Sequence, residues 1–374
     1  MIEVTLERVA HGGYVVGRVK NKVVFVTDGL PGERVLVEIT ETGARFDRAR
    51  VVEVLEPSDG RVAAPCPIAD ACGGCDWQHA SPATQRQLKT EVVREQLARL
   101  AGVSWDGHVE PVDPLRGWRT RMRYVVADGH VGLRARRSHD VVALPDQGCL
   151  AAVPGPSPAQ LDRLAEGARE LTVVHSVNGM SVFADDQLVS GPKMVRERAG
   201  GHEFRVAARG FWQVHPAAGD VLQAAVIQGL RPLPGDVALD LYCGAGLFAA
   251  ALVHAGAEVT GVELVAAAVA NARHNVPQGR FLAMPLAKAL RRLPPKVDLV
   301  VLDPPRRGAG AAVVAKIADM APRGIAYVAC DPASLARDLA WFEPLGYGPE
   351  SIRAFDLFPM THHVECVAVL KPRP

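Results

Sequence analysis

Short runs of alternating apolar and polar residues dominate the first sixty positions of the chain. The runs are Val4–Leu6, Tyr14–Val19, Val23–Val26, Val35–Ile39 and Ala49–Leu55. Alternation with a period of two is typical of half-buried strands, and turns rich in glycine and asparagine separate the runs. Five short strands in this space predict a small OB-like β-barrel over residues 1–60.

The next segment, residues 61–205, combines one clear helical pattern with weaker strand patterns. Apolar residues recur at helical spacing at Leu88, Val92, Val93, Leu97 and Leu100. Ser81 is a candidate N-cap and Pro82 fits the first helical position, so we predict an amphipathic helix over Ser81–Leu100. A second helix is expected near Pro158–Leu171, among mixed strands. This segment is therefore predicted to be a mixed α+β central domain.

From about residue 206 to residue 374, strand patterns alternate with alanine-rich helical patterns. The expected strands are Val237–Leu241, Glu258–Glu263, Val297–Asp303, Gly324–Cys330 and Val364–Leu370. Regular alternation of strands and helices is typical of a doubly wound, mostly parallel sheet. The fold class predicted for residues 206–374 is therefore α/β.

Composition excludes several classes of protein. Hydrophobic residues make up 48% of the 374 positions and charged residues 22%, which is ordinary for a globular protein and unlike a disordered or fibrous one. The longest uncharged apolar run, Leu241–Ala257, is shorter than the roughly 20 residues of a membrane span. Glu3 and Glu7 stand where a signal peptide would be basic and then apolar, so we expect a cytoplasmic protein without a membrane partner.

Charge is informative only locally, because the net charge is +1. Between Pro111 and Asp140 lie seven arginines, Arg116, Arg119, Arg121, Arg123, Arg134, Arg136 and Arg137, against three aspartates. Such a basic patch is typical of a nucleic-acid-binding surface and equally of an ordinary solvated face. The sequence leaves both interpretations open.

A glycine turn follows the first strand of the α/β part. Gly244 and Gly246 lie between this strand and a helix, and Glu263 ends the next strand, where its carboxylate could accept hydrogen bonds from both hydroxyls of a ribose. The turn alone also fits NAD. Downstream, Asp303-Pro304-Pro305 ends another strand, a feature of nucleic-acid methyltransferases that dehydrogenases do not require. We therefore favour S-adenosylmethionine as the ligand.

Two further residues at strand ends could carry chemistry. Cys330 ends the strand at Gly324–Cys330, and Glu365 lies at the start of the last strand. The ends of parallel strands face the ligand crevice, so Cys330 is expected near Asp303. Cys330 could instead be an inert buried thiol, and Glu365 an edge residue that faces water. A glutamate buried among apolar residues would need a partner or a role.

Three of the seven cysteines, Cys66, Cys72 and Cys75, lie within ten residues. An odd cysteine count in a chain expected to be cytoplasmic argues against a disulfide framework and for metal or cluster chemistry. Cys149 is the natural fourth ligand. Zinc and a four-iron cluster would both accept four thiolates, and the spacing alone does not separate them.

Taken together, the chain resembles the RNA uracil-5-methyltransferase family, and most closely its iron–sulfur branch that carries a TRAM domain and acts on large-subunit ribosomal RNA. Five segments carry the resemblance: Cys66–Gln78, Phe211–Val214, Asp240–Phe248, Leu302–Gly308, and Cys330–Asp338 with Phe358–Glu365. It implies a TRAM domain at residues 1–60, a class I, Rossmann-like methyltransferase domain, and a monomer that binds RNA, with ribosomal RNA favoured and tRNA as the alternative.

The resemblance also implies a mechanism. Cys330 adds to carbon 6 of a uracil, carbon 5 takes the methyl group of S-adenosylmethionine, Glu365 removes the carbon 5 proton, and Asp303 orients the reacting groups. The residues implied to contact the donor are Gln213, Asp240, Tyr242, Gly244, Gly246, Glu263 and Asp303. Cys66, Cys72, Cys75 and Cys149 are implied to hold a [4Fe–4S] cluster.

Three positions depart from the family pattern. His215 and Asp331 stand where asparagine is usual, and the segment Phe281–Lys288 lacks an acid that often lies near the adenine. A carboxylate at Asp331 would raise the pKa of the neighbouring thiol if it pointed that way. The remaining alternatives are methylation of another nucleobase, a silent RNA-binding homologue, and an NAD-linked iron–sulfur oxidoreductase.

Overall fold

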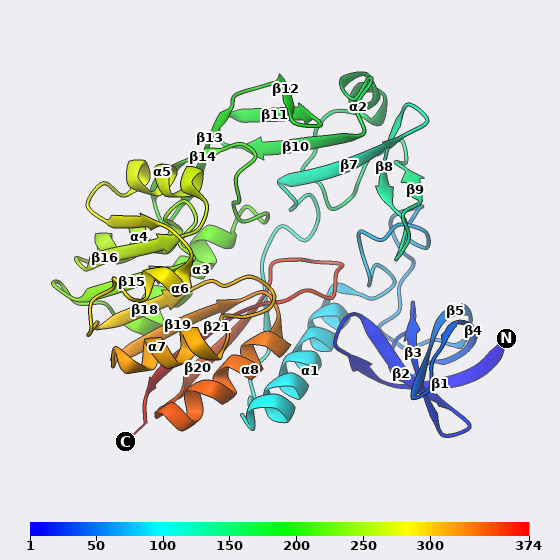
Figure 1. The fold of residues 1–374 in the computed structure, drawn as a ribbon. Coiled ribbons are helices and arrows are strands. Elements are labelled where there is room, and N and C mark those ends of the chain that lie inside the picture. Colours follow the sequence, from blue (N-terminus) through cyan, green and yellow to red (C-terminus); the bar gives the residue numbers. More distant parts are fainter. Residues whose placement is uncertain (374) are drawn as a thin grey trace.

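The computed structural model describes residues 1–373, which form a small barrel, a central antiparallel sheet and a large mixed sheet (Figure 1). The barrel lies beside the large sheet, with the helix α1 (Pro82–Ala101) between them. Among these residues, no helix is both long enough and apolar enough to cross a membrane.

The predicted barrel is confirmed as a closed, five-stranded one. Its strands are β1 (Ile2–Ala10), β2 (Tyr14–Val19), β3 (Lys22–Thr27), β4 (Arg34–Thr42) and β5 (Phe46–Glu56), in the order β1-β2-β3-β5-β4. Alternate residues such as Val4, Leu6, Val24, Val26 and Val35 point inward and form its core. Pairing of β1 with β4 closes the sheet and removes the exposed edges that open sheets leave.

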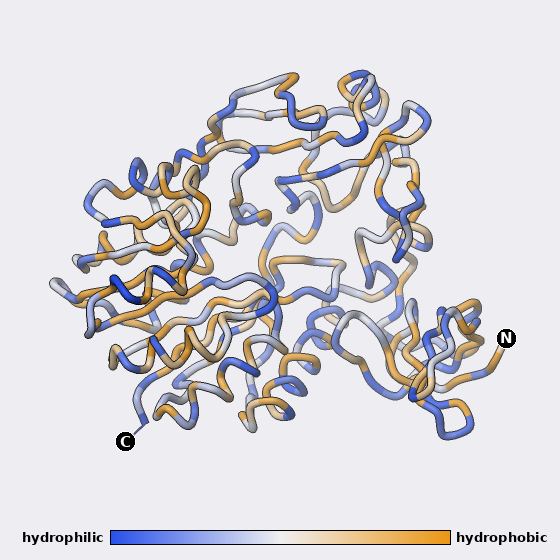
Figure 2. Tube along the Cα trace, viewed as in Figure 1, coloured by the Kyte–Doolittle hydropathy of each residue, from blue (hydrophilic) through white to orange (hydrophobic). Residues whose placement is uncertain are grey.

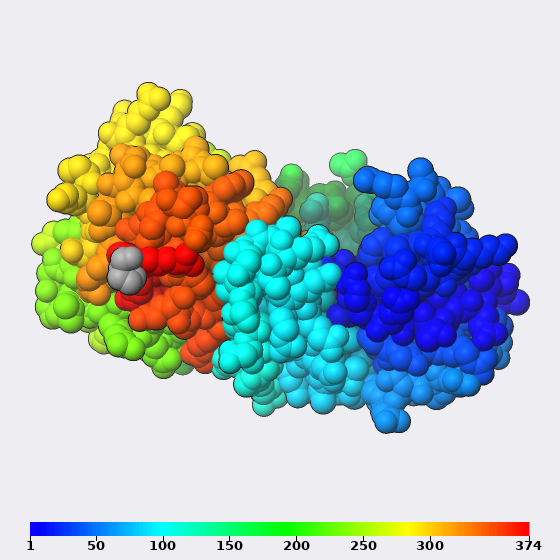
Figure 3. Space-filling model, turned by 90° about the horizontal axis from the view of Figure 1, so that it is seen from below, coloured from blue at the N-terminus to red at the C-terminus, as the bar shows by residue number. Residues whose placement is uncertain are grey.

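The helix α1 begins with the N-cap predicted from the sequence. Ser81 Oγ accepts a hydrogen bond from Thr84 N at 3.2 Å, and Gly102, with φ of 64°, ends the helix in the left-handed conformation. Leu88 and Val92 pack against the barrel residues Val9 and Leu30. In Figure 3, α1 separates the barrel from the C-terminal part of the chain.

The central sheet is antiparallel, in the order β12-β11-β10-β7-β8-β9. Its strands are β7 (Arg121–Ala127), β8 (His130–Arg134), β9 (Val141–Ala143), β10 (Glu170–Ser176), β11 (Gly179–Ala184) and β12 (Gln187–Ser190), followed by the hairpin of β13 (Met194–Ala199) and β14 (His202–Ala207). The helix expected near Pro158–Leu171 is shorter: α2 spans Pro158–Leu164. Gly167 has φ of 76°, and the following residues, including Val173 and Val174, enter β10.

The predicted α/β sheet is confirmed, with eight strands in the order β17-β16-β15-β18-β19-β21-β20-β6. The parallel strands are β15 (Val237–Leu241), β16 (Glu258–Glu263), β17 (Arg280–Ala283), β18 (Leu299–Leu302) and β19 (Gly324–Ala329). The remaining strands are β20 (Tyr347–Asp356), β21 (Glu365–Pro372) and the short β6 (Val109–Pro111). β21 is antiparallel to β19 and to β20, and β6 is parallel to β20. The strand order reverses between β15 and β18, where doubly wound sheets bind ligands.

Helices cover both faces of this sheet. One face carries α3 (Ala218–Leu230), α4 (Leu247–His254) and α5 (Ala266–Asn275), and the other carries α1, α6 (Leu286–Ala289), α7 (Ala311–Asp319) and α8 (Pro332–Phe342), which runs into the 3₁₀ turn Glu343–Leu345. Val301 faces the first layer, and Val300 and Leu302 face the second. Burial on both faces explains the continuous apolar runs of the strands, visible in Figure 2.

Candidate active site

The glycine turn lies at the carboxyl end of β15, beside the point where the strand order reverses. Tyr242, Gly244 and Gly246 have φ values of 64°, 53° and 92°. A Cβ at Gly246 would lie 3.2 Å from Val276 Cγ2, whereas a Cβ at Gly244 would meet nothing within 4 Å. The turn is therefore tightly packed on the α5 side and open beside Gly244, and it presents the amino terminus of α4 at this edge.

Two carboxylates flank the turn. Glu263, at the end of β16, accepts hydrogen bonds from Gly244 N at 3.3 Å and Val265 N at 2.8 Å. Asp240 is fully buried, its Oδ2 accepts from Ala249 N at 2.8 Å, and its Oδ1 has no partner among residues 1–373. Burial, with the nearby charges of Asp303 and Glu263, raises the pKa of Asp240 to about 8, against the lowering effect of the Ala249 N–H.

The sheet register brings Asp303, Cys330 and Glu365 together. Asp303 follows β18, Cys330 follows β19, and Glu365 begins β21. Leu302 of β18 pairs with Tyr327 of β19, and Ala329 pairs with Cys366, so Cys330 and Glu365 lie across from each other at one edge. Glu365 is buried, whereas Cys330 and Asp303 are half-buried.

Burial and mutual repulsion favour the neutral forms of these three groups. The pKa of Glu365 is raised well above its usual range by burial and then by Asp303. Burial raises the pKa of Asp303 to about 7. Burial, followed by the charges of Glu365 and Asp303, raises the pKa of Cys330 to about 12. Perturbed groups of this kind gather at functional sites more often than elsewhere.

A cation that sequence reasoning did not single out faces this cluster. Arg306, in the loop after β18, opposes the rise in the pKa of both Cys330 and Glu365. Its Nη2 lies 3.1 Å from His363 Nε2. The pKa of His363 is lowered to about 3, by burial first and then by His362 and Arg306, so the neutral ring accepts this hydrogen bond. The position of His363 next to Arg306 was not visible in the sequence.

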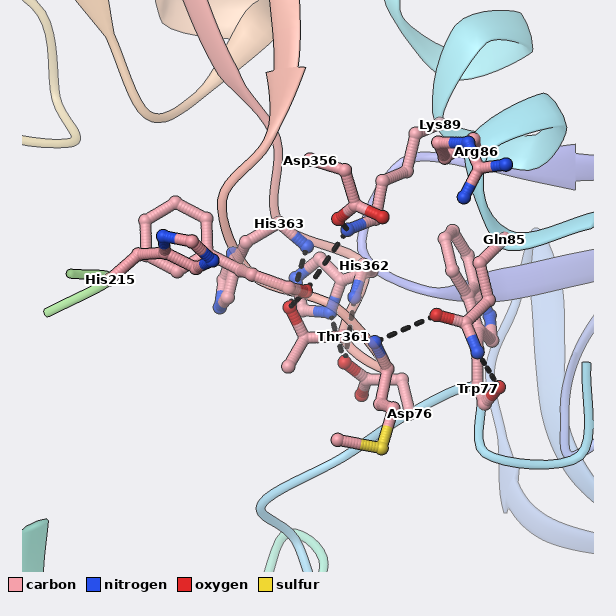
Figure 4. Close-up of polar contacts among 12 residues, drawn as sticks. Asp76, Trp77, Gln85, Arg86, Lys89, His215, Asp356, Thr361, His362 and His363 are labelled. Carbon is pink, nitrogen blue, oxygen red and sulfur yellow. Dashed lines mark hydrogen bonds and ion pairs between the residues drawn. The ribbon is translucent and has the colours of Figure 1, made fainter. Parts of the chain in front are cut away.

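The loop of residues 357–364, which leads into Glu365, is held by the segment after Cys75 (Figure 4). Asp76 N and Trp77 N both donate to Met360 O at 2.9 Å. In return, His362 donates to Asp76 Oδ2 from its backbone N at 3.0 Å and from Nδ1 at 2.7 Å. The cysteine segment is therefore joined directly to the loop that carries Glu365.

Two side chains of α1 complete this framework. Gln85 Oε1 accepts from Met360 N at 2.7 Å, while its Nε2 donates to Trp77 O at 3.0 Å. Lys89 Nζ donates to Asp356 Oδ1 at 2.5 Å and to the carbonyl of Phe358 at 3.0 Å. Lys89 and Asp356 are completely buried, so each requires the other to remain charged. We did not predict either residue, because nothing in the helical pattern marks a lysine on an inward face.

The four predicted cluster ligands line one cavity of about 40 Å³. Cys66, Cys72, Cys75 and Cys149 all belong to its lining. Arg119 lines the same cavity, and its buried Nε has no hydrogen-bond partner within residues 1–373. Over the same residues, the structure gathers no three His, Cys, Asp or Glu side chains closely enough to share one metal ion.

Some arginines of the basic patch are paired with carboxylates, and four of the seven are exposed: Arg116, Arg123, Arg134 and Arg137. Arg121 pairs with Glu197 and Arg123 with Glu170. Arg136 pairs with Asp28 of the barrel, and Arg119 lines the cysteine cavity. The seven arginines therefore do not form one free surface, because three are paired with carboxylates and Arg119 lines the cysteine cavity.

The structure also places Gln213, which is predicted to contact the methyl donor, and the three positions that depart from the family pattern. Gln213 lies half-buried in the loop between β14 and α3. His215 is buried; Nδ1 accepts from Ala217 N at 3.2 Å, and Nε2 lies 3.2 Å from the carbonyl of Pro114. Its ring stacks on Trp118, with ring centroids 6.3 Å apart. Residues 281–288 contain no aspartate or glutamate. Asp331 is the N-cap residue of α8.

Comparisons with known proteins decide the family. An RNA methyltransferase of Streptomyces avermitilis is 46% identical, over 99% of this chain and 98% of its own length, and one of Streptomyces coelicolor is 45% identical, over 99% and 92%. The chain belongs to the RNA methyltransferase family. Within it, residues 1–52 match the TRAM domain, residues 239–303 a methyltransferase domain, and residues 290–373 the family described as tRNA (uracil-5-)-methyltransferase.

One solved structure supports the fold of this RNA methyltransferase over its whole length. The Pyrococcus abyssi tRNA (uracil-54, C5)-methyltransferase, in complex with S-adenosyl-L-homocysteine, superposes with a TM-score of 0.77 at 21% identity, over 99% of this chain and all of that one. The predicted combination of a TRAM barrel and an α/β methyltransferase domain is therefore confirmed.

Proposed function

We propose that this RNA methyltransferase transfers a methyl group from S-adenosylmethionine to carbon 5 of a uridine, through a covalent bond between Cys330 and carbon 6. The observation that carries the proposal is the meeting of Cys330, Glu365 and Asp303 at one edge of the sheet, next to the glycine turn. A nucleophile, a base and a ligand site are the groups that this reaction needs.

Each step can be assigned to a residue. The Cys330 thiolate adds to carbon 6, and carbon 5, now enolate-like, takes the methyl group from the sulfonium donor. Glu365, which must be ionised when it acts as the base, removes the proton from carbon 5, and the carbon 6–sulfur bond breaks to release the Cys330 thiolate. Because burial raises the pKa of Cys330 to about 12, the thiol must lose its proton as substrate binds, and Arg306 is the nearby cation that favours the anion.

The donor site is proposed at the glycine turn. Open space beside Gly244, the unpartnered Oδ1 of Asp240 and the half-buried carboxylate of Glu263 fit a ligand with an amine and ribose hydroxyls. Leu264 and Val265, both exposed, lie next to Glu263 and could cover an adenine. Gln213, Tyr242, Gly246 and Asp303 are the remaining proposed contacts.

The cysteine cavity fits an anionic group held by thiolates. We propose that Cys66, Cys72, Cys75 and Cys149 hold a [4Fe–4S] cluster, which would serve as a structural centre for the segment that supports residues 357–364. The unpartnered Nε of Arg119 suits a negatively charged occupant. Zinc would accept the same four thiolates, and it is the resemblance to the iron–sulfur branch of the family that favours a cluster.

The RNA is proposed to be ribosomal, on the resemblance to the iron–sulfur branch of the family. A second candidate is tRNA, because the matched family and the superposed structure are both named for tRNA. These two candidates share the same chemistry and differ only in the RNA that presents the uridine.

Covalent trapping tests the reaction. The protein is incubated with S-adenosylmethionine and RNA containing 5-fluorouridine, with ribosomal RNA and tRNA in separate arms, beside a Cys330→Ala variant. Fluorine at carbon 5 leaves no proton for Glu365 to remove, so the methylated adduct cannot resolve. We expect an adduct that survives denaturation with one of the two RNAs and is absent from the variant.

A matched control is Cys243→Ala, which removes another buried thiol beside the glycine turn. It should still form the adduct. If intact protein forms no adduct with either RNA, or if Cys330→Ala still forms it, the proposed nucleophile is wrong.

A further inference from the structure

The turn between β1 and β2 of the barrel reaches the active site. His11, at this turn, places Nε2 at 2.8 Å from Oδ2 of Asp331. Asp331 directly follows Cys330, and 320 positions separate it from His11 in the sequence. The TRAM barrel is therefore in direct contact with the residue next to the proposed nucleophile.

Contacts on three sides fix this turn. Trp77 Nε1 donates to the carbonyl of Gly13 at 3.3 Å, and Trp77 itself is almost fully buried. A Cβ at Gly13, where φ is 84°, would come within 3.3 Å of the His362 ring. The Arg137 guanidinium lies over the Tyr14 ring, 4.2 Å from its centroid. The backbone that carries His11 is thus held beside the start of α8 by contacts of its neighbours Gly13 and Tyr14.

Both carboxylate oxygens of Asp331 are occupied. Oδ1 accepts from Ser334 N at 2.7 Å, which caps α8, and Oδ2 faces His11. Burial alone would raise the pKa of Asp331, but the hydrogen bonds from His11 and Ser334 hold it below its usual range. Asp331 is therefore an anion that accepts both hydrogen bonds, and His11 Nε2 is the donor.

The charge on Asp331 acts on Cys330. The titratable and charged groups that face this thiol are Glu365 of β21, Asp303 and Arg306 after β18, and Asp331 at the start of α8. Of these, only Arg306 favours the thiolate, and the three carboxyl groups oppose it. A donor that holds and partly neutralises one of them lowers this opposition.

We propose that His11 is a positioning residue for Cys330: it holds the Asp331 carboxylate against the barrel and limits the negative charge that Asp331 presents to the thiol. The inference rests on the proposed role of Cys330 as nucleophile. This role also explains how the protein accommodates an aspartate at position 331, where asparagine is usual in the family. The negative charge of Asp331 is hydrogen-bonded by His11 of the barrel. Docking of the barrel and reactivity of the nucleophile are then coupled.

The test measures the rate at which iodoacetamide alkylates Cys330 as a function of pH, quantified by mass spectrometry of the peptide that contains it. This readout needs neither RNA nor donor. In His11→Ala we expect the pH midpoint of the alkylation rate to rise by about half a unit. At a pH below this midpoint, the reaction should be roughly threefold slower than in the wild type. The expected shift is small because partly exposed charged pairs contribute little free energy. Adding Asp331→Asn in the same chain removes the charge and should restore the wild-type rate.

The matched control is His139→Ala, which removes another exposed histidine far from α8 in the sequence. It should leave the profile unchanged. The inference is overturned if His11→Ala keeps the wild-type profile, or if Asp331→Asn fails to restore the rate in the double variant. Should alkylation behave as expected while covalent trapping fails with both RNAs, the positioning role stands and the proposed reaction is wrong.

Discussion

At the scale of single residues, the proposed site depends on carboxyl groups that are buried close together. Asp240, Asp303 and Glu365 all have a raised pKa, and burial is the largest cause in each case. An acid that holds its proton more tightly in the folded chain than in the unfolded one makes folding weaker as pH rises. These groups therefore make the donor-free protein less stable as the pH rises from about 4 towards about 8.

Asp240 gives the clearest prediction. Its pKa rises from 3.8 to about 8 on folding, so the free energy of unfolding should fall as pH increases from about 4 to about 8. We expect the urea midpoint of the wild type to drop between about pH 6 and pH 8.5, and to drop less in Asp240→Asn. Asp319→Asn, at an exposed position of α7, is the control and should follow the wild type. An equal drop in Asp240→Asn would contradict the prediction.

At the scale of elements, α1 links the barrel, the cysteine segment and the loop of residues 357–364. Its apolar face was predictable from the spacing of Leu88, Val92 and Leu97. Its polar inward contacts, Gln85 to Met360 and Lys89 to Asp356, were not. They satisfy the carboxylate at the end of β20 and backbone groups of the loop of residues 357–364, more than 250 positions away in the sequence. No local sequence pattern predicts such a distant partner.

The buried pair of Lys89 and Asp356 should be worth much more than a surface ion pair. In Lys89→Met the Asp356 carboxylate is left buried and unpaired, so we expect a loss of about 3 kcal/mol in the free energy of unfolding. Asp356→Leu in the same chain should recover most of this loss, because no isolated charge then remains. Urea denaturation measures both. The exposed Lys288→Met is the control, and a loss below about 1 kcal/mol in Lys89→Met would show that the pair matters little.

At the scale of the whole molecule, Trp77 connects three parts of the chain. It packs with Val9 and Leu30 of the barrel and with Leu88 of α1, and it donates to Gly13. It also follows Asp76 in the cysteine segment. Anything that holds this segment in place, including an occupant of the cysteine cavity, therefore also holds the barrel and the loop that carries Glu365.

Removing the Trp77 side chain should loosen the barrel before the rest of the protein unfolds. Truncation of a buried tryptophan costs about 3–5 kcal/mol at its site. In Trp77→Ala we expect faster proteolytic cleavage between the barrel and α1, within residues 57–65, while the circular dichroism of the α/β part is retained. Trp341→Ala, where the side chain is 41% exposed, is the control. Equal cleavage rates in the two variants would refute this role of Trp77.

The sequence alone determined the barrel, the α/β sheet, the glycine turn and the candidate residues Asp303, Cys330 and Glu365. These features follow from local periodicity, from turn residues and from the order of the strands, and all three can be identified in the amino-acid sequence. Only the tertiary structure decided which groups meet: His11 with Asp331, Arg306 with His363, and Lys89 with Asp356. The reason is that charge, burial and hydrogen bonding act over a few ångströms in space, and folding brings together groups that the sequence keeps far apart.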